Sequence, residues 1–548
     1  MTGTLPTASE LLETRLRWRR ISQERPTPSL RIALLATYTV DPLLPYLGAY
    51  LHDQGIAATL WAGPFHQIVQ QCLDDTSATA RFDPHLLVVL PRFEDLWPVE
   101  AGTRAPATPS VADNMRDVAD AAVRAGWHWQ TCLLFVLPAV PSDDAGVGSD
   151  GDPAGMSAMA ETVRQMLRSR LTGRPAVFVA DLDAAVRTVG VRDAMHQGLW
   201  QLARIPYTEV VFAALAQRLS RIVMIRVFGP CRGLLVDAGS LLSGSGLDAI
   251  SQLAGPLRRL KAQGVRIVLR RGREPWPASA SQALADLDYL ADGWSCDGPV
   301  GEELARLAGE TGGGLRNVRL LTADPDVAQG VVTPPGPGPS LVVGSDPETW
   351  PQALAEAGLF DRLPLRSQAA VDRCETGGET SAVAQSPTVE AYIAGLGVDM
   401  TYEPLTRSMV PEAMDMLSRT TDLTLGVELS AADLCAAADA ATAAIVRVRD
   451  RLGDYGPSAL VAARMDGPLC DLHTFLVSCP VLGKGVEEWL FEHVRAWAHE
   501  HGCAQISVRL RLTGRNQLAF AFFDRKQTGQ ADDASPRLFV RIESAARG

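Results

Sequence analysis

Short apolar runs separated by helix-like segments fill most of the chain before residue 367, and they restrict its fold more than any other feature. Each run is short enough for a strand that is buried on both faces. The runs are Arg31–Ala36, Ala57–Ala62, His85–Leu90, Cys132–Leu137, Ala176–Ala180, Gly233–Val236, Val265–Leu269, Val318–Leu321 and Leu341–Val343. Because strands that alternate with helices form parallel sheets covered on both faces, this pattern predicts two doubly wound α/β domains.

The order of the predicted elements changes after residue 397. Strands are predicted at 398–404, 443–449, 458–464, 471–478, 503–511 and 536–543, and helices at 409–419, 430–439 and 485–501. Antiparallel strands around one central helix favour an α+β fold of the acyltransferase (GNAT-like) type. The predicted fold class is therefore multidomain α/β, with two doubly wound parallel-sheet domains followed by an α+β domain.

At 548 residues the chain is too long for a single hydrophobic core. The expected segments are a helical leader at 1–30, a first α/β domain at 31–221, a second at 222–366, a linker at 367–388 and a third domain at 389–548. The linker is rich in Gly, Ser, Thr and Ala and lacks a hydrophobic period.

Composition restricts the environment of the protein and its partners. A hydrophobic content of 47% with 21% charged residues is typical of soluble globular proteins. The sequence lacks an apolar run of membrane-spanning length and the apolar core of a secretory signal. Nine cysteines without a CxxC pair predict reduced thiols in the cytoplasm. A net charge of −12 without a basic stripe argues against nucleic acid as a partner.

The run Gly233–Val236 is followed directly by Asp237 and a loop of small residues. Open α/β sheets place their chemistry at the carboxyl ends of the strands. A phosphoryl-transfer aspartate there needs a second carboxylate two residues later, to protonate the leaving group and support Mg²⁺. That position is Gly239, so we expect the site to retain its backbone without its chemistry, and to bind no metal.

The strongest local signal lies where a predicted strand ends before a helix, in the segment Leu482, Gly483, Lys484, Gly485 and Val486. Glycines allow backbone N–H groups to turn towards an anion, and a helix N-terminus favours negative charge. The motif fits a cradle for the phosphate of a pantetheine-bearing ligand, with Lys484 as an added cation. It fits equally an ordinary strand–turn–helix with glycines at the turn.

Four residues near this loop are candidates for chemistry at a thioester: Asp454, His473, Cys479 and Asn516. His473 and Cys479 are six residues apart, so on one strand both side chains would point to the same face. Either could act as base or nucleophile. The alternative for each is a structural role, as a hydrogen-bonded core histidine and a buried cysteine.

A different kind of site is suggested by Asp193-Ala-Met-His196, which has the Asp-x-x-His spacing of the lipase-like SGNH fold. The matching nucleophile should follow the first strand in a Gly-Asp-Ser context. The chain has Thr37-Tyr38-Thr39 there, so a hydrolase that uses Asp193 and His196 is the weaker interpretation.

Taken together, these segments resemble the FkbH-like proteins of polyketide and nonribosomal peptide assembly lines. The resemblance is carried by 33–47 (ALLATYTVDPLLPYL), 177–190 (VFVADLDAAVRTVG), 199–208, 234–244 (LLVDAGSLLSG), 304–325, 450–456 (DRLGDYG) and 474–488 (TFLVSCPVLGKGVEE). It implies an SGNH-like, a HAD-like (haloacid-dehalogenase-like) and a GNAT-like domain. Active members are described as dephosphorylating a glyceryl unit from a bisphosphoglycerate and delivering it as a thioester to an acyl carrier protein.

The motifs of this family are kept unevenly. Its phosphatase-type motifs fall on Asp237–Leu241, Leu269–Arg271, 294–300 and Thr322–Pro325, which lack the required second carboxylate, serine, lysine and paired aspartates. In the third domain Gly483, Gly485 and Asn516 match the family, whereas Pro480 and Phe523 replace an arginine and a tyrosine. The resemblance therefore implies a lost phosphatase-type centre and a better-preserved transferase half.

Three functions remain open from the sequence. The leading hypothesis is transfer of a small acyl or related group involving a thioester on CoA or on an acyl or peptidyl carrier protein. Its ligand would be phosphopantetheine held at 482–486, without a tightly bound cofactor. The alternatives are a non-catalytic scaffold that docks carrier proteins or partner enzymes, and an SGNH-type hydrolase.

Overall fold

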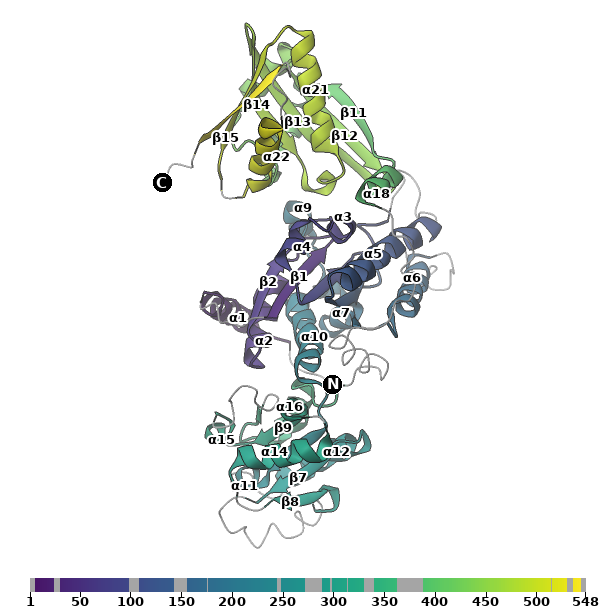
Figure 1. The fold of residues 1–548 in the computed structure, drawn as a ribbon, viewed down its shortest axis with the longest axis vertical. Helices are drawn as coiled ribbons and strands as arrows, with labels where there is room; N and C mark the ends of the chain where they lie inside the picture. The colour runs from purple at the N-terminus through teal and green to yellow at the C-terminus, as the bar shows by residue number, and fades with distance from the viewer. Residues whose placement is uncertain are drawn as a thin grey trace.

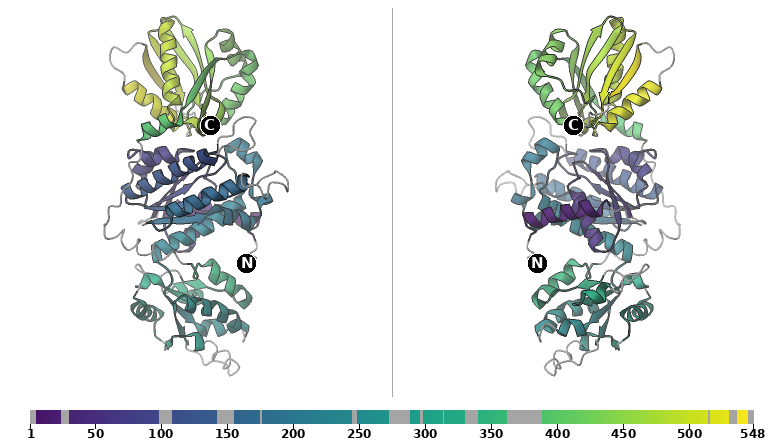
Figure 2. Two further views of the ribbon diagram at one scale, coloured as in Figure 1. Left: turned by 90° about the vertical axis from the view of Figure 1, so that its right-hand side faces the viewer. Right: turned by 90° about the vertical axis from the view of Figure 1, so that its left-hand side faces the viewer.

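The computed structural model describes residues 5–23, 30–97, 108–141, 155–174, 176–243, 248–271, 288–295, 298–312, 314–329, 340–361, 388–513, 515–529 and 536–543. Within these ranges the chain forms three α/β units, and the first unit lies between the third and the second (Figures 1 and 2). Each unit is built on one sheet, as the fold class from the sequence predicts. Most of the predicted linker, 367–388, and the proline-rich run at 333–339 lie outside the described residues.

The first unit contains a five-stranded parallel sheet in the order β2-β1-β3-β4-β5. Its strands are β1 (Leu30–Ala36), β2 (Ala58–Ala62), β3 (Leu86–Leu90), β4 (Cys132–Leu137) and β5 (Val177–Asp181). Its helices are α1 (Ala8–Ile21), α2 (Leu43–Asp53), α3 (Ile68–Leu73), α4 (Ala78–Phe82), α5 (Thr108–His128), α6 (Met156–Leu171), α7 (Leu182–Val189), α8 (Val191–Ala194), α9 (Gln197–Ala203) and α10 (Glu209–Phe228).

Alternation along these strands sends buried side chains to both faces of the sheet. Leu34 and Val88 pack in the cluster that contains α2 and α10, whereas Leu35 and Val89 pack in the cluster of α3, α5 and α6. The second cluster also takes in Leu396 of the third unit. The apolar pattern of the strands therefore explains why helices cover both faces.

The second unit repeats the doubly wound design with the parallel order β10-β9-β6-β7-β8. Its strands are β6 (Gly233–Asp237), β7 (Arg266–Arg270), β8 (Gly293–Ser295), β9 (Val318–Thr322) and β10 (Leu341–Val342). Its helices are α11 (Ala238–Ser243), α12 (Asp248–Ala262), α14 (Val300–Thr311), α15 (Pro325–Gln329) and α16 (Trp350–Glu356). The helix α10 continues to Phe228 because its buried face extends through Met224 and Ile225, so the predicted boundary at 221/222 falls inside a helix.

The third unit has a six-stranded sheet in the order β11-β12-β13-β14-β15-β16. Its strands are β11 (Asp399–Pro404), β12 (Ala443–Asp450), β13 (Gly453–Asp466), β14 (Leu469–Val477), β15 (Gln505–Arg511) and β16 (Arg537–Glu543). Its helices are α18 (Val389–Leu396), α19 (Val410–Arg419), α20 (Ala431–Asp439), α21 (Val486–Glu500) and α22 (Gln517–Thr528).

The sheet of the third unit is mixed, whereas the sequence predicted antiparallel strands. The pairs β14/β15 and β15/β16 are parallel. The reason is that α21 and α22 each carry the chain back over the sheet before the next strand begins, and such a crossover makes neighbouring strands parallel. Across all three units, the described helices include none with the length and apolar character of a membrane span.

Candidate functional site

The carboxyl ends of β1 and β2 face the third unit (Figure 1). Arg451 of the third unit forms an ion pair with Asp117 on α5. A side-chain carbon at Gly483 would stand 3.2 Å from the Gln67 amide, so the glycine loop also touches the first unit. The edge of the first sheet where α/β proteins usually carry their chemistry therefore meets the loop that the sequence singles out.

Thr37, at the end of β1, stands where the hydrolase interpretation needs a nucleophile. Its hydroxyl donates to Asp95 Oδ2 at 2.8 Å and accepts from the Arg92 N–H at 2.9 Å. The Arg92 guanidinium in turn donates to Asp95 Oδ1 at 3.2 Å. The threonine proton is thus bonded to a buried carboxylate, and within the described part of the chain Thr37 and His196 share no hydrogen bond.

His66 follows β2 and is a residue that the sequence analysis missed. Its backbone is left-handed (φ 58°), a conformation that costs energy in a residue other than glycine. Nδ1 lies 3.2 Å from the Thr37 carbonyl oxygen, so Nδ1–H donates there. Nε2 is buried without a hydrogen-bond partner among the described residues. Backbone strain and a buried nitrogen without a partner are features of functional sites. Neither can be predicted from a sequence motif, so the sequence analysis did not select His66.

Two groups of this edge have strongly shifted proton affinities. Burial lowers the pKa of His66 to about 4, and the nearby Lys484 adds to the effect. Burial raises the pKa of Asp95 to about 7, although Arg92 opposes the shift. His66 is therefore neutral at pH 7, whereas Asp95 can exchange a proton near neutrality.

Two replacements should separate these titrations in thermal unfolding measured from pH 4 to 8. The stability that arises from the lowered pKa of His66 is fully present above its ordinary value of 6.5, and it is lost as the pH falls towards 4. The stability that arises from the raised pKa of Asp95 is fully present below its ordinary value of 3.8, and it is lost as the pH rises towards 7. We expect Asp95→Asn to lose stability on acidification, His66→Gln to lose it on alkalinisation, and the wild type to change less than either. Identical profiles for all three proteins would contradict these assignments.

Lys484 does not provide the cation that the sequence predicts for a ligand phosphate at the glycine loop. Its Nζ donates to Asp450 Oδ2 at 2.8 Å and to the Tyr455 hydroxyl at 2.6 Å. The Lys484 and Asp450 side chains are 1% and 0% exposed. Burial lowers the pKa of Lys484. The lysine turns inwards because the carboxylate at the end of β12 is buried and needs a positive partner.

The glycine loop lies between β14 and α21, as the sequence predicts. Gly483 and Gly485 are left-handed, with φ of 72° and 85°, and Gly485 immediately precedes α21. The Gly483 N–H donates to Glu487 Oε1 at 3.1 Å, and burial raises the pKa of that carboxyl group. A side chain at Gly485 would meet open space. An anion can therefore approach the start of α21 at Gly485, while the Gly483 N–H is already used.

The gap between β14 and β15 is filled by the segment Leu423–Leu425. The two strands pair only from Leu469–Leu472 to Gln505–Val508. Beyond that point the Val477 N–H donates to the Leu423 carbonyl at 3.0 Å, and the Arg511 N–H donates to the Leu425 carbonyl at 2.9 Å. An extended ligand entering between the strands would need the same main-chain groups.

His473 and Cys479 occupy different surroundings, contrary to the expectation of a shared face. β14 ends at Val477, so its alternation does not reach Cys479. The Cys479 thiol donates to Asp422 Oδ2 at 3.1 Å, and burial raises its pKa to about 12. His473 lies 3.5 Å from Asp471 and lines a cavity of about 560 Å³ between α20 and β13–β14.

Asn516 and Asp454 form bonds to the backbone. Asn516 is fully buried; its Oδ1 accepts from the Thr513 N–H at 2.9 Å, and its Nδ2 donates to the carbonyls of Thr424 and Arg511 at 3.1 and 2.9 Å. Asp454 accepts from the Gly456 N–H at 2.8 Å. Asn516 thus anchors the segment that fills the gap, and these bonds favour a structural role for both residues.

Asp193 and His196 lie in and after the short helix α8. His196 caps α9, where its Nδ1 accepts from the Leu199 N–H at 3.1 Å. The Asp193 main-chain carbonyl accepts from Thr208. Both side chains are exposed. In this fold His196 therefore caps a helix and Asp193 closes a loop, which accounts for their Asp-x-x-His spacing.

In the second unit, Asp237 ends β6 as expected and is enclosed by polar partners. Arg270 Nη1 donates to its Oδ1 at 3.3 Å, and the Thr322 hydroxyl donates to its Oδ2 at 3.0 Å. Arg270 Nε lies 3.5 Å from the buried Glu303 carboxylate. A guanidinium on the protein thus stands between two carboxylates, at the edge where a phosphoryl-transfer site would bind its cation.

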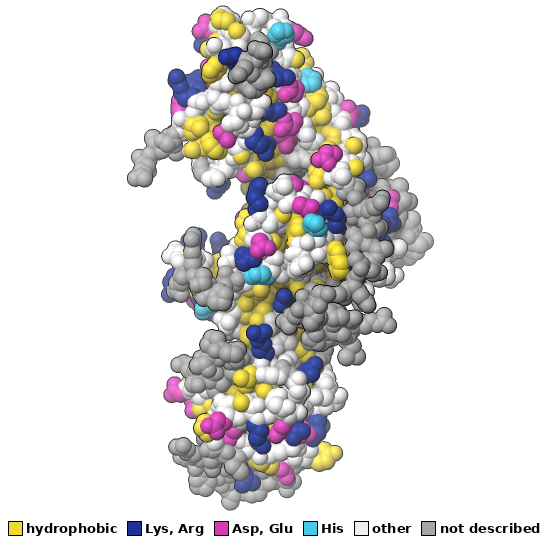
Figure 3. Space-filling view, viewed as in Figure 1, with side chains coloured by type: hydrophobic (Ala, Val, Ile, Leu, Met, Phe, Trp, Pro, Cys, Tyr) yellow, Lys and Arg dark blue, Asp and Glu magenta, His cyan; other side chains and the backbone are white. Residues whose placement is uncertain are grey.

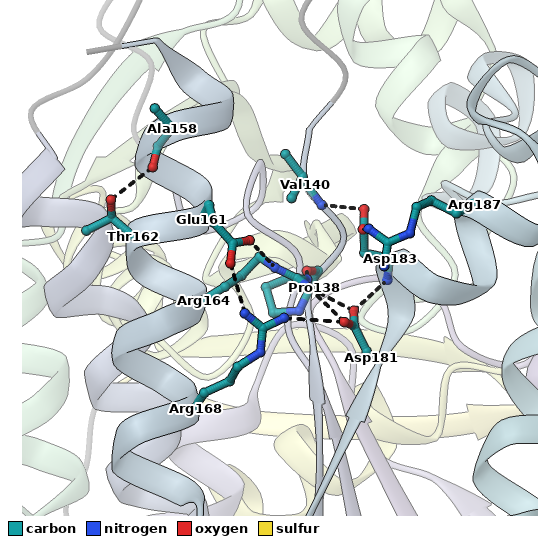
Figure 4. Close-up of polar contacts among 10 residues, drawn as sticks. All are labelled: Pro138, Val140, Ala158, Glu161, Thr162, Arg164, Arg168, Asp181, Asp183 and Arg187. Atoms are coloured by element: carbon teal, nitrogen blue, oxygen red, sulfur yellow. Dashed lines mark hydrogen bonds and ion pairs between the residues drawn. The ribbon is translucent and has the colours of Figure 1, made fainter. Parts of the chain in front are cut away.

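A further polar cluster lies around Asp181 and Asp183, at the carboxyl end of β5 (Figure 4). Arg164 of α6 is buried and donates twice to Asp181 at 2.9 Å, as well as to Glu161 and to the Pro138 carbonyl. Asp183 accepts from the Val140 N–H at 3.2 Å. Because these hydrogen bonds join α6, β5 and the chain after β4, the cluster stabilises the packing of these elements.

No protein-family model and no curated protein matches the chain. Among solved structures, the N-terminal part of BF1531 from Bacteroides fragilis, which contains a phosphatase domain complexed with Mg, has a TM-score of 0.47 and 15% identity, over 64% of this chain and 98% of that one. N-acetylglutamate synthase from Neisseria gonorrhoeae, complexed with coenzyme A and L-arginine, has a TM-score of 0.16 and 10% identity, over 91% and 90%. Both TM-scores are below 0.5, so neither likeness supports an activity for this chain.

Proposed function

We propose that the third unit transfers a small acyl or related group by way of a thioester on CoA or on an acyl or peptidyl carrier protein, in a natural-product pathway. One observation carries this proposal. The parallel strands β14 and β15 diverge, and β14 leads through the left-handed Gly483 and Gly485 into α21. Divergent strands beside a helix N-terminus suit an extended ligand that ends in a phosphate.

Binding by this route requires the segment Leu423–Leu425 to move. The amides of a pantetheine arm would replace its bonds to Val477 and Arg511. The phosphate would then lie near Gly485, at the start of α21. The same displacement would uncover Cys479, whose partner Asp422 adjoins the segment.

Cys479 is the nucleophile that fits this arrangement best. Its S–H would add to the thioester carbonyl and the carrier C–S bond would break. The proton would pass through Asp422 to the leaving thiol, and the acyl group would remain on Cys479 until an acceptor takes it. His473 lies in its own cavity and has no role in this step.

Intact-protein mass spectrometry of carrier proteins, before and after incubation with the chain, tests the proposal. Gly485→Asp should abolish the mass change, because its carboxylate would repel the ligand phosphate. Gly485→Ala is the matched control: it introduces the same backbone strain without charge and should retain activity. His196→Ala should also remain active. Activity that survives Gly485→Asp but is lost in a folded His196→Ala variant would favour the hydrolase instead.

A non-catalytic scaffold is the second candidate, and the filled gap between β14 and β15 is the observation that favours it. In that case the segment Leu423–Leu425 would stay in place and Cys479 would remain a buried thiol. Carrier proteins would then bind the chain without any change in their mass.

A further inference from the structure

One face of the third sheet concentrates arginine although the protein is acidic overall. Along β15 and β16 the side chains of Ile506, Val508, Leu510 and Leu538 enter the core. Alternation therefore places Arg509, Arg511, Arg537 and Arg541 on the opposite face. All four are exposed, and Phe539 among them is 48% exposed. By contrast, charges of both signs are interspersed over the side of the molecule in Figure 3, and the net charge is −12.

The strand register brings like charges together on this face. Arg509 is the direct neighbour of Arg541 in the parallel pairing of β15 with β16. Like charges at such positions destabilise a sheet. Arg509 reaches only Asp471, at 3.5 Å, and Arg541 forms no ion pair with a carboxylate of the described residues. An anionic partner would relieve this repulsion between Arg509 and Arg541, so the pair favours the binding of such a partner.

None of the described helices packs over the arginine face. On this side of the sheet α19 and α20 pack over β12 and β13, and α21 and α22 lie on the other side. Asp471 links Arg509 to His473, which lines the cavity beside α20. Arg464 lines the same cavity. The face therefore runs without interruption from the edge strand β16 to a cavity large enough for a small molecule.

We propose that the face formed by Arg509, Arg511, Arg537, Phe539 and Arg541 docks an acidic helix of a carrier protein. This inference rests on the proposed function, since that function supplies the partner. Charge complementarity favours an acidic protein, and Phe539 can pack on the apolar side of a helix. A nucleic acid is disfavoured by the overall charge and by Asp471 and Glu543 on the same face.

Titration of acyl and peptidyl carrier proteins, each with and without its phosphopantetheine arm, tests the docking face. We expect both forms to bind the wild type, more weakly at high salt. Arg541→Glu should weaken binding by about ten- to a hundred-fold. Its melting temperature should be unchanged or higher, because a carboxylate would then adjoin Arg509. The matched control is Arg495→Glu on α21, a half-buried arginine on the opposite face, which should bind as the wild type does.

The outcomes separate docking from transfer. Binding that depends on Arg541 without a mass change in the carrier supports docking and contradicts the transferase. Equal binding by wild type and Arg541→Glu, or no binding of any carrier, overturns docking. A single-stranded RNA or an anionic vesicle that binds in place of the carriers, with the same dependence on Arg541, would also overturn it. Carrier acylation at the wild-type rate in Arg541→Glu leaves transfer standing and removes the docking role.

Discussion

Lys484→Ala is expected to lower the free energy of unfolding of the third unit by about 3–5 kcal/mol, because it leaves a buried carboxylate without its cation. Asp450 is fully buried and is held by the Lys484 ammonium at 2.8 Å, with Tyr455 bonded to both. Hydrogen exchange of the amides of β12–β14 would measure the loss within this unit, where whole-protein unfolding need not be two-state. The effect differs from a simple loss of ligand affinity, which an exposed lysine would have produced.

The matched control removes both charges at once. Lys484→Met combined with Asp450→Leu replaces the buried pair by apolar side chains of similar size and should recover most of the lost stability. If Lys484→Ala instead retains wild-type exchange rates and only weakens binding of CoA, then the lysine acts on the ligand and the buried pair is unimportant.

Arg270→Ala should destabilise the second unit by a similar amount, about 3–5 kcal/mol, because Asp237 and Glu303 would be left as two buried carboxylates. Their side chains are 3% and 7% exposed. Thermal unfolding with and without Mg²⁺ gives a second readout. We expect Mg²⁺ to leave the wild type unchanged, because the guanidinium already stands between the carboxylates, and to restore part of the stability of Arg270→Ala.

Arg266→Ala on the same strand is the matched control. Arg266 pairs with Glu310 at 3.0 Å on the surface, where its side chain is 45% exposed, and such a pair contributes at most about 1 kcal/mol. A wild-type protein that is stabilised by Mg²⁺, with the effect lost in Asp237→Asn, would show that this centre binds Mg²⁺ and would contradict the expectation.

Local pattern was sufficient for most of the helices and strands and for two of the turns that follow strands. The apolar run before Asp237 predicted β6, and the strand ends at Asp237 as expected. Gly483 and Gly485 predicted the turn before α21. Each of these depends on residues that are neighbours in the chain, so burial, alternation and glycine conformation can be read from the sequence.

Other features need residues that are far apart in the chain. Whether a strand gap is open depends on Leu423 reaching Val477, and the role of Lys484 depends on Asp450. The His66 Nε2 is buried without a hydrogen-bond partner among the described residues, at the place where the first unit approaches Lys484 and Asp450 of the third. Periodicity carries no information on these approaches, which is why the sequence assigned Lys484 to the phosphate of a ligand.

The sequence by itself determined two parallel sheets, a third α+β unit, a strand that ends at Asp237 and a glycine turn, because each follows from short-range side-chain pattern. Only the tertiary structure decided that Arg270 lies between Asp237 and Glu303, and that Arg509 stands beside Arg541. The sequence shows no basic stripe because these arginines are divided between two strands. Parallel pairing across the α22 crossover gathers them on one face, and that pairing is set by packing of the whole sheet.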